Sequence, residues 1–243
     1  MKSHFVFFTI FITISFSRFS NAQMIQLESF QIDEKEVSIG DFSQYIKSTG
    51  FKTKAEREGG GLVYEFGWER KPGWNWLTPY GLPAQDDEPA VHITFDEAQA
   101  YCIWKGKRLP TEKEWISAAY TEQRLSPSDG FEKGKTYSFP TGNSPRGANC
   151  LGQCGDTPAI DYSHLLDRGV GHSRVGSTKR GVNGLYDMGA NVWEWVDIKD
   201  ASEKGTRGGS WWYGSSQMMS DYDATKPRDM AVVYIGFRCI KPN

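Results

Sequence analysis

Glycine and proline recur every few residues in the second half of this 243-residue chain, and this spacing most limits its fold. Between Tyr120 and Cys239 the pattern allows only short strands and loops. The chain has 26 glycines and nine tryptophans, and hydrophobic residues make up 38% of it. The sequence therefore predicts one loop-rich domain and excludes a helical bundle.

The first half contains signals for regular structure. Residues 24–38 alternate apolar and polar side chains, which is typical of a strand. A helix is predicted to begin at Ser38 and to end at Gly50. Two further short helices are predicted after the capping boxes at residues 94–97 and 111–114.

Residues 51–88 form a long segment that we expect to be irregular, because Trp, Gly and Pro are dense in GWERKPGWNWLTPYG. A loop of this length inside a domain is usually functional. The alternative is a surface lid that its own tryptophans hold in place.

Residues 1–22 are typical of a secretory signal peptide. Lys2 supplies the positive charge, residues 5–16 are apolar, and Ser20 and Ala22 precede the expected cleavage site. A membrane anchor is disfavoured because a span needs about 20 apolar residues. We therefore expect a secreted or periplasmic domain over residues 23–243. The net charge of -2 gives no indication of a nucleic-acid or membrane partner.

An exported chain meets an oxidising compartment, where disulfides persist. The four cysteines are Cys102, Cys150, Cys154 and Cys239, and they allow three pairings. The short spacing favours a Cys150–Cys154 bridge, which leaves Cys102 with Cys239. A zinc site is disfavoured because the Cys150 and Cys154 pair has too few further ligands nearby.

Two sets of oxygen-bearing residues are candidates for a hard cation such as calcium. One set is Asp187 with Glu194 in GLYDMGANVWEW, and the other is Asn149 with Asp167. The alternative is that these side chains cap turns and bind backbone amides. The histidines form no metal-binding pattern, and Ser210 has no acid–base partner that the sequence can assign.

Several segments, taken in this order, resemble the formylglycine-generating enzyme or sulfatase-modifying factor family. They include EPAVHITFDEAQAYCIWKGKRLPTEKEW, GLYDMGANVWEW, RGGSW and GFRC, and together they run from about Phe30 to Cys239. KRLPTEKEW and the closing RGGSW and GFRC pair are the most specific. The resemblance implies a single α+β domain of the C-type-lectin-like fold with little regular structure. It also implies the Cys102–Cys239 disulfide.

The resemblance further implies two calcium sites. One would use the side chains of Asn149 and Asp167 with the carbonyls of Cys150 and Gly169. The other would use the side chains of Asp187 and Glu194 with the carbonyls of Ala190 and Val192. This chain has Gly189-Ala190 where the family usually has Ala-Gly, so a required positive φ would strain Ala190.

This sequence departs most from the family's pattern at the copper site. The copper thiolates stand at the third and eighth positions after GGS, which are Tyr213 and Met218 in this chain. Cu(I) prefers soft sulfur ligands, and a tyrosine with a methionine matches this site poorly. Copper is therefore not expected, and Met218 is predicted to fill the core. Trp193, Ser210, Tyr213 and Met218 are the candidate pocket residues.

Three functions follow from these observations. The favoured one is a calcium-stabilised domain that binds a peptide, protein or small molecule without the copper-dithiol cysteine oxidation. The first alternative is an oxidoreductase of altered chemistry on the same scaffold, of the formylglycine-generating or oxidative tailoring type. The second alternative is a calcium-dependent lectin, for which only Glu88-Pro89-Ala90 approaches a sugar-binding tripeptide.

Overall fold

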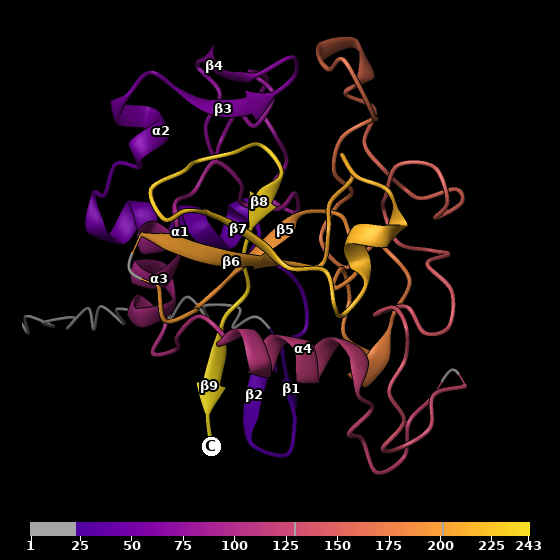
Figure 1. The fold of residues 1–243 in the computed structure, drawn as a ribbon. Helices are drawn as coiled ribbons and strands as arrows, with labels where there is room; N and C mark the ends of the chain where they lie inside the picture. Colours follow the sequence, from indigo (N-terminus) through magenta and orange to yellow (C-terminus); the bar gives the residue numbers. More distant parts are fainter. Residues whose placement is uncertain (1–22, 129, 201) are drawn as a thin grey trace, which may run out of the picture.

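A computed structural model describes residues 23–128, 130–200 and 202–243 of the chain (Figure 1). The expected signal peptide, residues 1–22, lies outside this part. The helices are α1 (Ile39–Thr49), α2 (Lys54–Arg57), α3 (Phe95–Trp104) and α4 (Glu112–Tyr120), with short 3-10 turns at Ser163–Leu165, Val182–Gly184 and Ser215–Met218. The strands are β1 (Met24–Gln26), β2 (Phe30–Asp33), β3 (Gly60–Tyr64), β4 (Trp68–Pro72), β5 (Trp193–Val196), β6 (Glu203–Arg207), β7 (Ala224–Pro227), β8 (Ile235–Gly236) and β9 (Ile240–Pro242).

Three small sheets organise the described residues. β1, β2 and β9 form an antiparallel sheet in the order β1-β2-β9, so the two ends of the domain meet in it. A second sheet has the order β7-β6-β5-β8, in which only β5 and β8 are parallel. β3 and β4 form a separate hairpin. The predicted α+β fold with little regular structure is confirmed.

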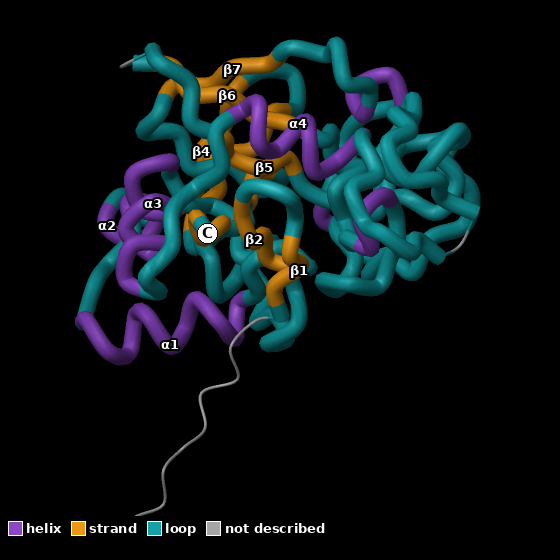
Figure 2. The backbone as a smooth tube through the Cα atoms, turned by 90° about the horizontal axis from the view of Figure 1, so that it is seen from below, coloured by secondary structure: helices purple, strands orange, loops and turns teal. Residues whose placement is uncertain are grey.

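The helices begin where the sequence predicts. The Ser38 side chain accepts from the amide of Asp41 at the start of α1, and Gly50 ends this helix with a φ of 67°. α3 and α4 both begin with complete capping boxes, at residues 94–97 and 111–114. Figure 2 shows α1, α2 and α3 on one side of the sheets and a large loop-rich half on the other.

The segment at residues 51–88 is more regular than predicted. It contains α2, which starts with its own capping box at residues 53–56, and the β3–β4 hairpin. Trp74 and Trp76 are only 8% and 5% exposed, and both pack in the main core. These two tryptophans hold the segment on the domain, while much of the rest of it is exposed.

Both predicted disulfides are present, and the distance between the Cα atoms of each pair is ordinary for a disulfide. The Cα atoms of Cys102 and Cys239 are 5.7 Å apart, and those of Cys150 and Cys154 are 5.6 Å apart. Consequently none of the four cysteines is free. Among the helices of the described residues, none is long and apolar enough to cross a bilayer.

Candidate functional site

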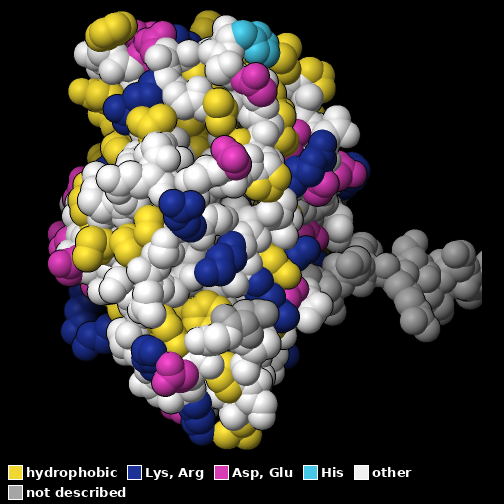
Figure 3. All heavy atoms as spheres, turned by 90° about the vertical axis from the view of Figure 1, so that its right-hand side faces the viewer, with side chains coloured by type: hydrophobic (Ala, Val, Ile, Leu, Met, Phe, Trp, Pro, Cys, Tyr) yellow, Lys and Arg dark blue, Asp and Glu magenta, His cyan; other side chains and the backbone are white. Residues whose placement is uncertain are grey.

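A cavity of about 400 Å³ opens where the turn of the β3–β4 hairpin meets two loops of the second half. We call it the aromatic groove, and its lining residues are Tyr64, Glu65, Phe66, Asp167, Arg168, Trp212 and Tyr213. Phe66 is 96% exposed, whereas Trp212 is only 4% exposed. Figure 3 shows the face built by the loop-rich half, where hydrophobic side chains gather toward the upper end and Lys and Arg side chains scatter below.

Two glycines turn the chain from β6 into the groove. Gly208 and Gly209 have φ values of 95° and 79°, which favour glycine over other residues. A Cβ atom on Gly208 would also lie 2.7 Å from the carbonyl oxygen of Met188. After this turn the amide of Trp211 donates to the Asn191 carbonyl at 2.9 Å, and the next two residues reach the groove.

Arg168 lies over the aromatic wall of the groove. Its guanidinium carbon is 4.8 Å from the ring centroid of Trp212 and 5.8 Å from that of Tyr213. One guanidinium nitrogen donates to the Trp212 carbonyl at 2.6 Å, which fixes the stacked position. A guanidinium held over aromatic faces keeps further donors for a ligand carboxylate or carbonyl.

Tyr234 lies behind this wall. Its ring stacks on Trp212 at 5.9 Å and meets Tyr213 edge-on at 5.8 Å. Its hydroxyl is buried, and among the described residues its polar neighbour is the Tyr213 side chain. Burial raises the pKa of Tyr234 far above its usual value, and it also raises the pKa of Tyr213. Both side chains are therefore neutral hydroxyls at physiological pH.

The four candidate pocket residues do not form one site. The Trp193 ring packs 5.8 Å from the ring of Tyr213, which lines the groove. Ser210 is fully buried, and its hydroxyl accepts only a long 3.4 Å hydrogen bond from the Trp212 amide. Met218 lies in a separate buried cluster with Ala148, Cys154 and Ala190. The site therefore shows no activated serine.

The first set of calcium candidates has oxygen atoms available for a cation. Asp167 is exposed at the edge of the groove, and no hydrogen bond to the carbonyls of Cys150 and Gly169 is present within the described residues. The Asn149 amide nitrogen donates to Gly171, and its oxygen accepts only from a threonine, at 3.2 Å. Carboxylate, amide and carbonyl oxygens are the types of ligand that a hard cation such as calcium prefers.

The second set already has protein partners. The guanidinium of Arg238 binds both oxygens of Glu194, at 2.7 to 2.9 Å, and both residues are buried. Trp115 donates to the same carboxylate at 2.7 Å. Asp187 accepts from Thr178 at 2.6 Å and from a backbone amide. A cation at this set would have to share Glu194 with Arg238.

Ala190 has a φ of 59°, so the positive φ that was expected to strain this residue is present.

Comparisons with known proteins identify the family of this chain. A family profile described as "Sulfatase-modifying factor enzyme 1-like domain" matches residues 12–243. This chain belongs to the sulfatase-modifying factor family. Its relatives include the formylglycine-generating enzyme of Thermomonospora curvata, which is 32% identical over 70% of this chain and 60% of that protein. The mouse protein named "Inactive C-alpha-formylglycine-generating enzyme 2" is 31% identical over 72% and 60% of the two chains.

Other matches, in sequence or in fold alone, have different names. Hercynine oxygenase of Mycobacterium tuberculosis is 27% identical over 72% of this chain and 39% of that protein. The structure of PvdO from Pseudomonas aeruginosa has a TM-score of 0.59 at 20% identity, and the match covers 88% of this chain and 80% of PvdO. The present chain spans about half to three fifths of the length of the first curated relatives it matches.

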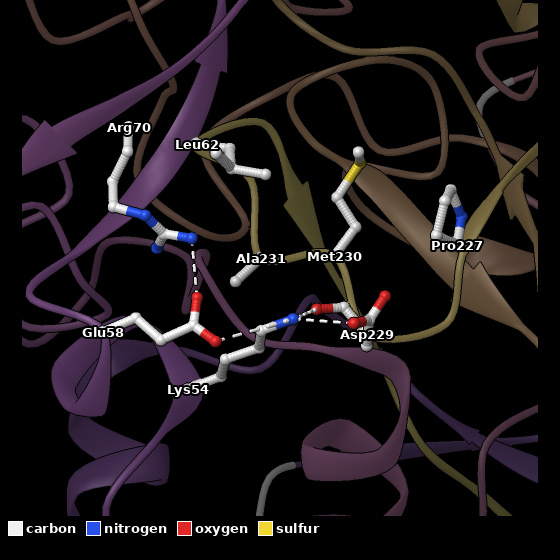
Figure 4. A pocket seen from close by; sticks show the side chains of 8 residues that line it. All are labelled: Lys54, Glu58, Leu62, Arg70, Pro227, Asp229, Met230 and Ala231. Atoms are coloured by element: carbon white, nitrogen blue, oxygen red, sulfur yellow. Dashed lines mark hydrogen bonds and ion pairs between the residues drawn. The ribbon is translucent and has the colours of Figure 1, made fainter.

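A second hollow of this family member, about 180 Å³ in volume, lies between α2 and the loop that follows β7 (Figure 4). Lys54 donates to the Asp229 carboxylate at 2.7 Å, and Arg70 pairs with Glu58 at 2.6 Å. The two cations and two carboxylates compensate each other, so this hollow offers no net charge to a ligand.

Two polar features were not predicted from the sequence. Arg168 has no sequence signature, because its partners lie more than forty residues away at Trp212. His172 is buried and contacts the Glu88 carboxylate at 2.7 Å and the Tyr80 hydroxyl at 3.1 Å. Burial lowers the pKa of His172, and its two partners satisfy both ring nitrogens, which indicates a structural role.

Proposed function

We propose that this chain is an exported binding domain that lacks the copper-dithiol cysteine oxidation of formylglycine-generating enzymes. The observation that carries the proposal is the identity of Tyr213 and Met218 at the two positions where the resemblance places the copper thiolates. All four cysteines of the chain are in disulfides, so no other thiol replaces them. The similarity to a relative named as inactive also supports this reading.

The ligand we propose is a peptide, a protein segment or a small molecule that binds in the aromatic groove. The exposed rings of Tyr64 and Phe66 offer apolar faces, and Arg168 offers hydrogen-bond donors beside them. Glu65 is already paired with Lys71 at 2.9 Å, so Arg168 is not neutralised by it. The groove therefore favours a ligand with an aromatic or apolar group next to a carboxylate or carbonyl.

The oxidation test uses a peptide that carries the sulfatase cysteine motif. The purified chain is incubated with this peptide, Cu(I), oxygen and a reductant, and mass spectrometry follows conversion of the cysteine to an aldehyde. No conversion is expected. Conversion above the level of a protein-free control would overturn the proposal.

The binding test follows tryptophan fluorescence while a short peptide that ends in an aromatic residue with a free carboxylate is added. Arg168→Ala is expected to weaken binding about tenfold or more, because it removes a charge-assisted contact of about 1.5 kcal/mol. Arg146→Ala is the control, since Arg146 is exposed and distant in sequence from the groove lining. Equal binding by both variants would place the ligand elsewhere.

A second candidate function is an oxidoreductase of altered chemistry. The similarity to hercynine oxygenase favours it, as does an aromatic cluster in which the Trp193 ring lies 5.8 Å from the rings of both Tyr213 and Tyr222. Elemental analysis after exchange into calcium separates the candidates. Retained iron or copper at one ion per chain in the protein with both disulfides intact would support the oxidoreductase and count against a binding domain.

We also propose that calcium stabilises the domain through the set of Asn149 and Asp167. Calcium is expected to raise Tm relative to a chelator, and Asp167→Asn is expected to reduce this increase. Asp156→Asn is the control because Asp156 is exposed and outside the set. An increase that Asp167→Asn leaves intact would contradict this site. Export is supported by the signal-like residues 1–22 and by the two disulfides.

A further inference from the structure

Three sulfur atoms meet beneath the loop at residues 150–154. The Met218 sulfur lies 3.7 Å from the Cys154 sulfur, and Cys154 is bonded to Cys150. Cys154 and Met218 are both fully buried. Because a disulfide sulfur has no hydrogen to donate, this approach is a sulfur–sulfur contact and not a hydrogen bond.

Contacts other than the disulfide hold these sulfurs together. The amide of Leu151 donates to the Tyr213 carbonyl at 2.8 Å, and the Ser215 hydroxyl donates to the Gln153 side chain at 2.6 Å. The Tyr120 hydroxyl donates to the Met218 carbonyl at 2.7 Å. Opening the disulfide would therefore leave the 150–154 loop attached to the segment that carries Met218.

The backbone near Met218 is shaped to its side chain. A Cβ atom at Gly189 would lie 2.8 Å from the Met218 methyl carbon, so only glycine leaves space for it without movement. With the methyl group in this space, the thioether sulfur remains beside Cys154. Cys150 is partly exposed, whereas Cys102 and Cys239 are fully buried. A soluble reductant therefore reaches the Cys150–Cys154 bridge first.

We propose that reduction of this bridge creates a three-sulfur site for Cu(I), built from Cys150, Cys154 and Met218. A phosphine or dithiol reductant supplies two electrons, the sulfur–sulfur bond breaks, and each cysteine sulfur takes up one proton. When Cu(I) binds, both cysteine sulfurs release their protons to water. Thiolate and thioether sulfurs are the ligands that Cu(I) prefers.

The distances agree with such a site. Sulfur atoms bound to one ion at about 2.3 Å lie roughly 3.8 to 4.0 Å apart in tetrahedral or trigonal geometry. The Met218 and Cys154 sulfurs already have nearly this spacing, at 3.7 Å. Only the Cys150 sulfur must move away from its bonded distance of 2.07 Å, and it is the partly exposed member. This site is separate from the aromatic groove and does not depend on the proposed ligand.

The test is a Cu(I) titration of the full mature chain against a chromophoric Cu(I) chelator, without oxygen. The protein is first treated with a phosphine that is then removed, and alkylation with peptide mapping verifies that Cys150 and Cys154 are the reduced pair. The reduced chain is expected to bind one Cu(I), and the oxidised chain is expected to bind none. Met218→Leu should weaken binding at least tenfold, whereas Met219→Leu, at a 39% exposed neighbour, should leave it unchanged.

A variant that needs no reductant keeps the test independent of the reduced fold. Cys150→Ser leaves the sulfurs of Cys154 and Met218 in place, and it should bind Cu(I) more weakly than the reduced chain but still depend on Met218. Equal affinity of Met218→Leu and the unsubstituted chain would overturn the proposal, as would equal binding by the oxidised protein.

Discussion

At the scale of single residues, Gly189 leaves the space that the Met218 side chain fills. Gly189→Ala places a methyl group 2.8 Å from the Met218 methyl carbon in a fully buried cluster. Overpacking of this kind costs about 1 to 2 kcal/mol of unfolding free energy, which urea denaturation measures. Gly67→Ala should change stability by less than about 0.5 kcal/mol, because Gly67 has open space around it.

A double-mutant cycle tests the cause of this loss. In a Met218→Ala background, the loss of unfolding free energy caused by Gly189→Ala should fall toward zero, because the Met218 methyl group that the new side chain would clash with is absent. A cost that persists in this background would mean that the backbone at residue 189, and not Met218, requires glycine.

Glu36 gives a prediction on pH dependence. Burial and the nearby carboxylates of Asp187 and Glu194 raise the pKa of Glu36 well above its usual value. The folded state thus binds this proton more tightly than the unfolded state, so the contribution of Glu36 to stability is greatest at low pH. It is lost as the pH rises through the folded-state pKa. Relative to the unsubstituted chain, Glu36→Gln should therefore gain stability as the pH rises above the usual range of a glutamate pKa.

Unfolding by urea across this pH range measures the difference. Glu28→Gln is the matched control, because Glu28 is exposed and lies outside this cluster of buried carboxylates. A Glu36→Gln difference that does not change with pH would show that Glu36 titrates as it does in the unfolded chain.

The residue scale also shows where prediction from the sequence ends. The patterns pointed to Asp187 and Glu194 as important carboxylates, and both are buried at the centre of the domain. Their partners were not predictable, because Arg238 lies 44 residues from Glu194 and only the fold brings them together. Residue type and spacing identify carboxylates that could bind a cation. Long-range packing decides whether a metal ion or a protein side chain such as Arg238 binds them.

At the scale of elements, the start of α4 links local sequence to the core. The Thr111 side chain accepts from the Glu114 amide, and the Glu114 carboxylate accepts from the Thr111 amide at 2.8 Å. Trp115 in the same turn donates to Glu194. Thr111→Ala should cost about 1 kcal/mol, measured by urea unfolding, because it removes the cap. Lys113→Ala, at an exposed position of α4, should be nearly neutral. A similar cost for both would show that the loss at Thr111 does not come from the cap.

Capping signals also explain which elements were predictable. α1, α3 and α4 begin at the expected residues because caps are encoded within four consecutive positions. The hairpin of β3 and β4 was missed because its glycines, and the tryptophans in and just after it, are typical of a loop. Trp74 and Trp76, which follow β4, pack in the main core against distant elements, and no local pattern contains that information.

At the scale of the whole molecule, the two disulfides are expected to contribute unequally to the free energy of unfolding. Cys102 and Cys239 are 137 residues apart in sequence and join α3 to the segment that leads into β9. Cys150 and Cys154 are four residues apart and close a short surface loop. In the chain-entropy view, the long loop contributes about 5 kcal/mol and the short one about 2 kcal/mol.

Replacing each pair by alanine tests this difference. Cys102→Ala with Cys239→Ala should lower Tm far more than Cys150→Ala with Cys154→Ala, because the long bridge removes much more freedom from the unfolded chain. Thermal unfolding measured without reductant gives both values. Equal losses would mean that packing around the sulfurs, and not chain entropy, sets their contributions. The expected order has a consequence for the sulfur cluster: the domain can lose the Cys150–Cys154 bridge and still be held by Cys102–Cys239, which is the condition under which Cys150, Cys154 and Met218 can bind a metal in a folded chain.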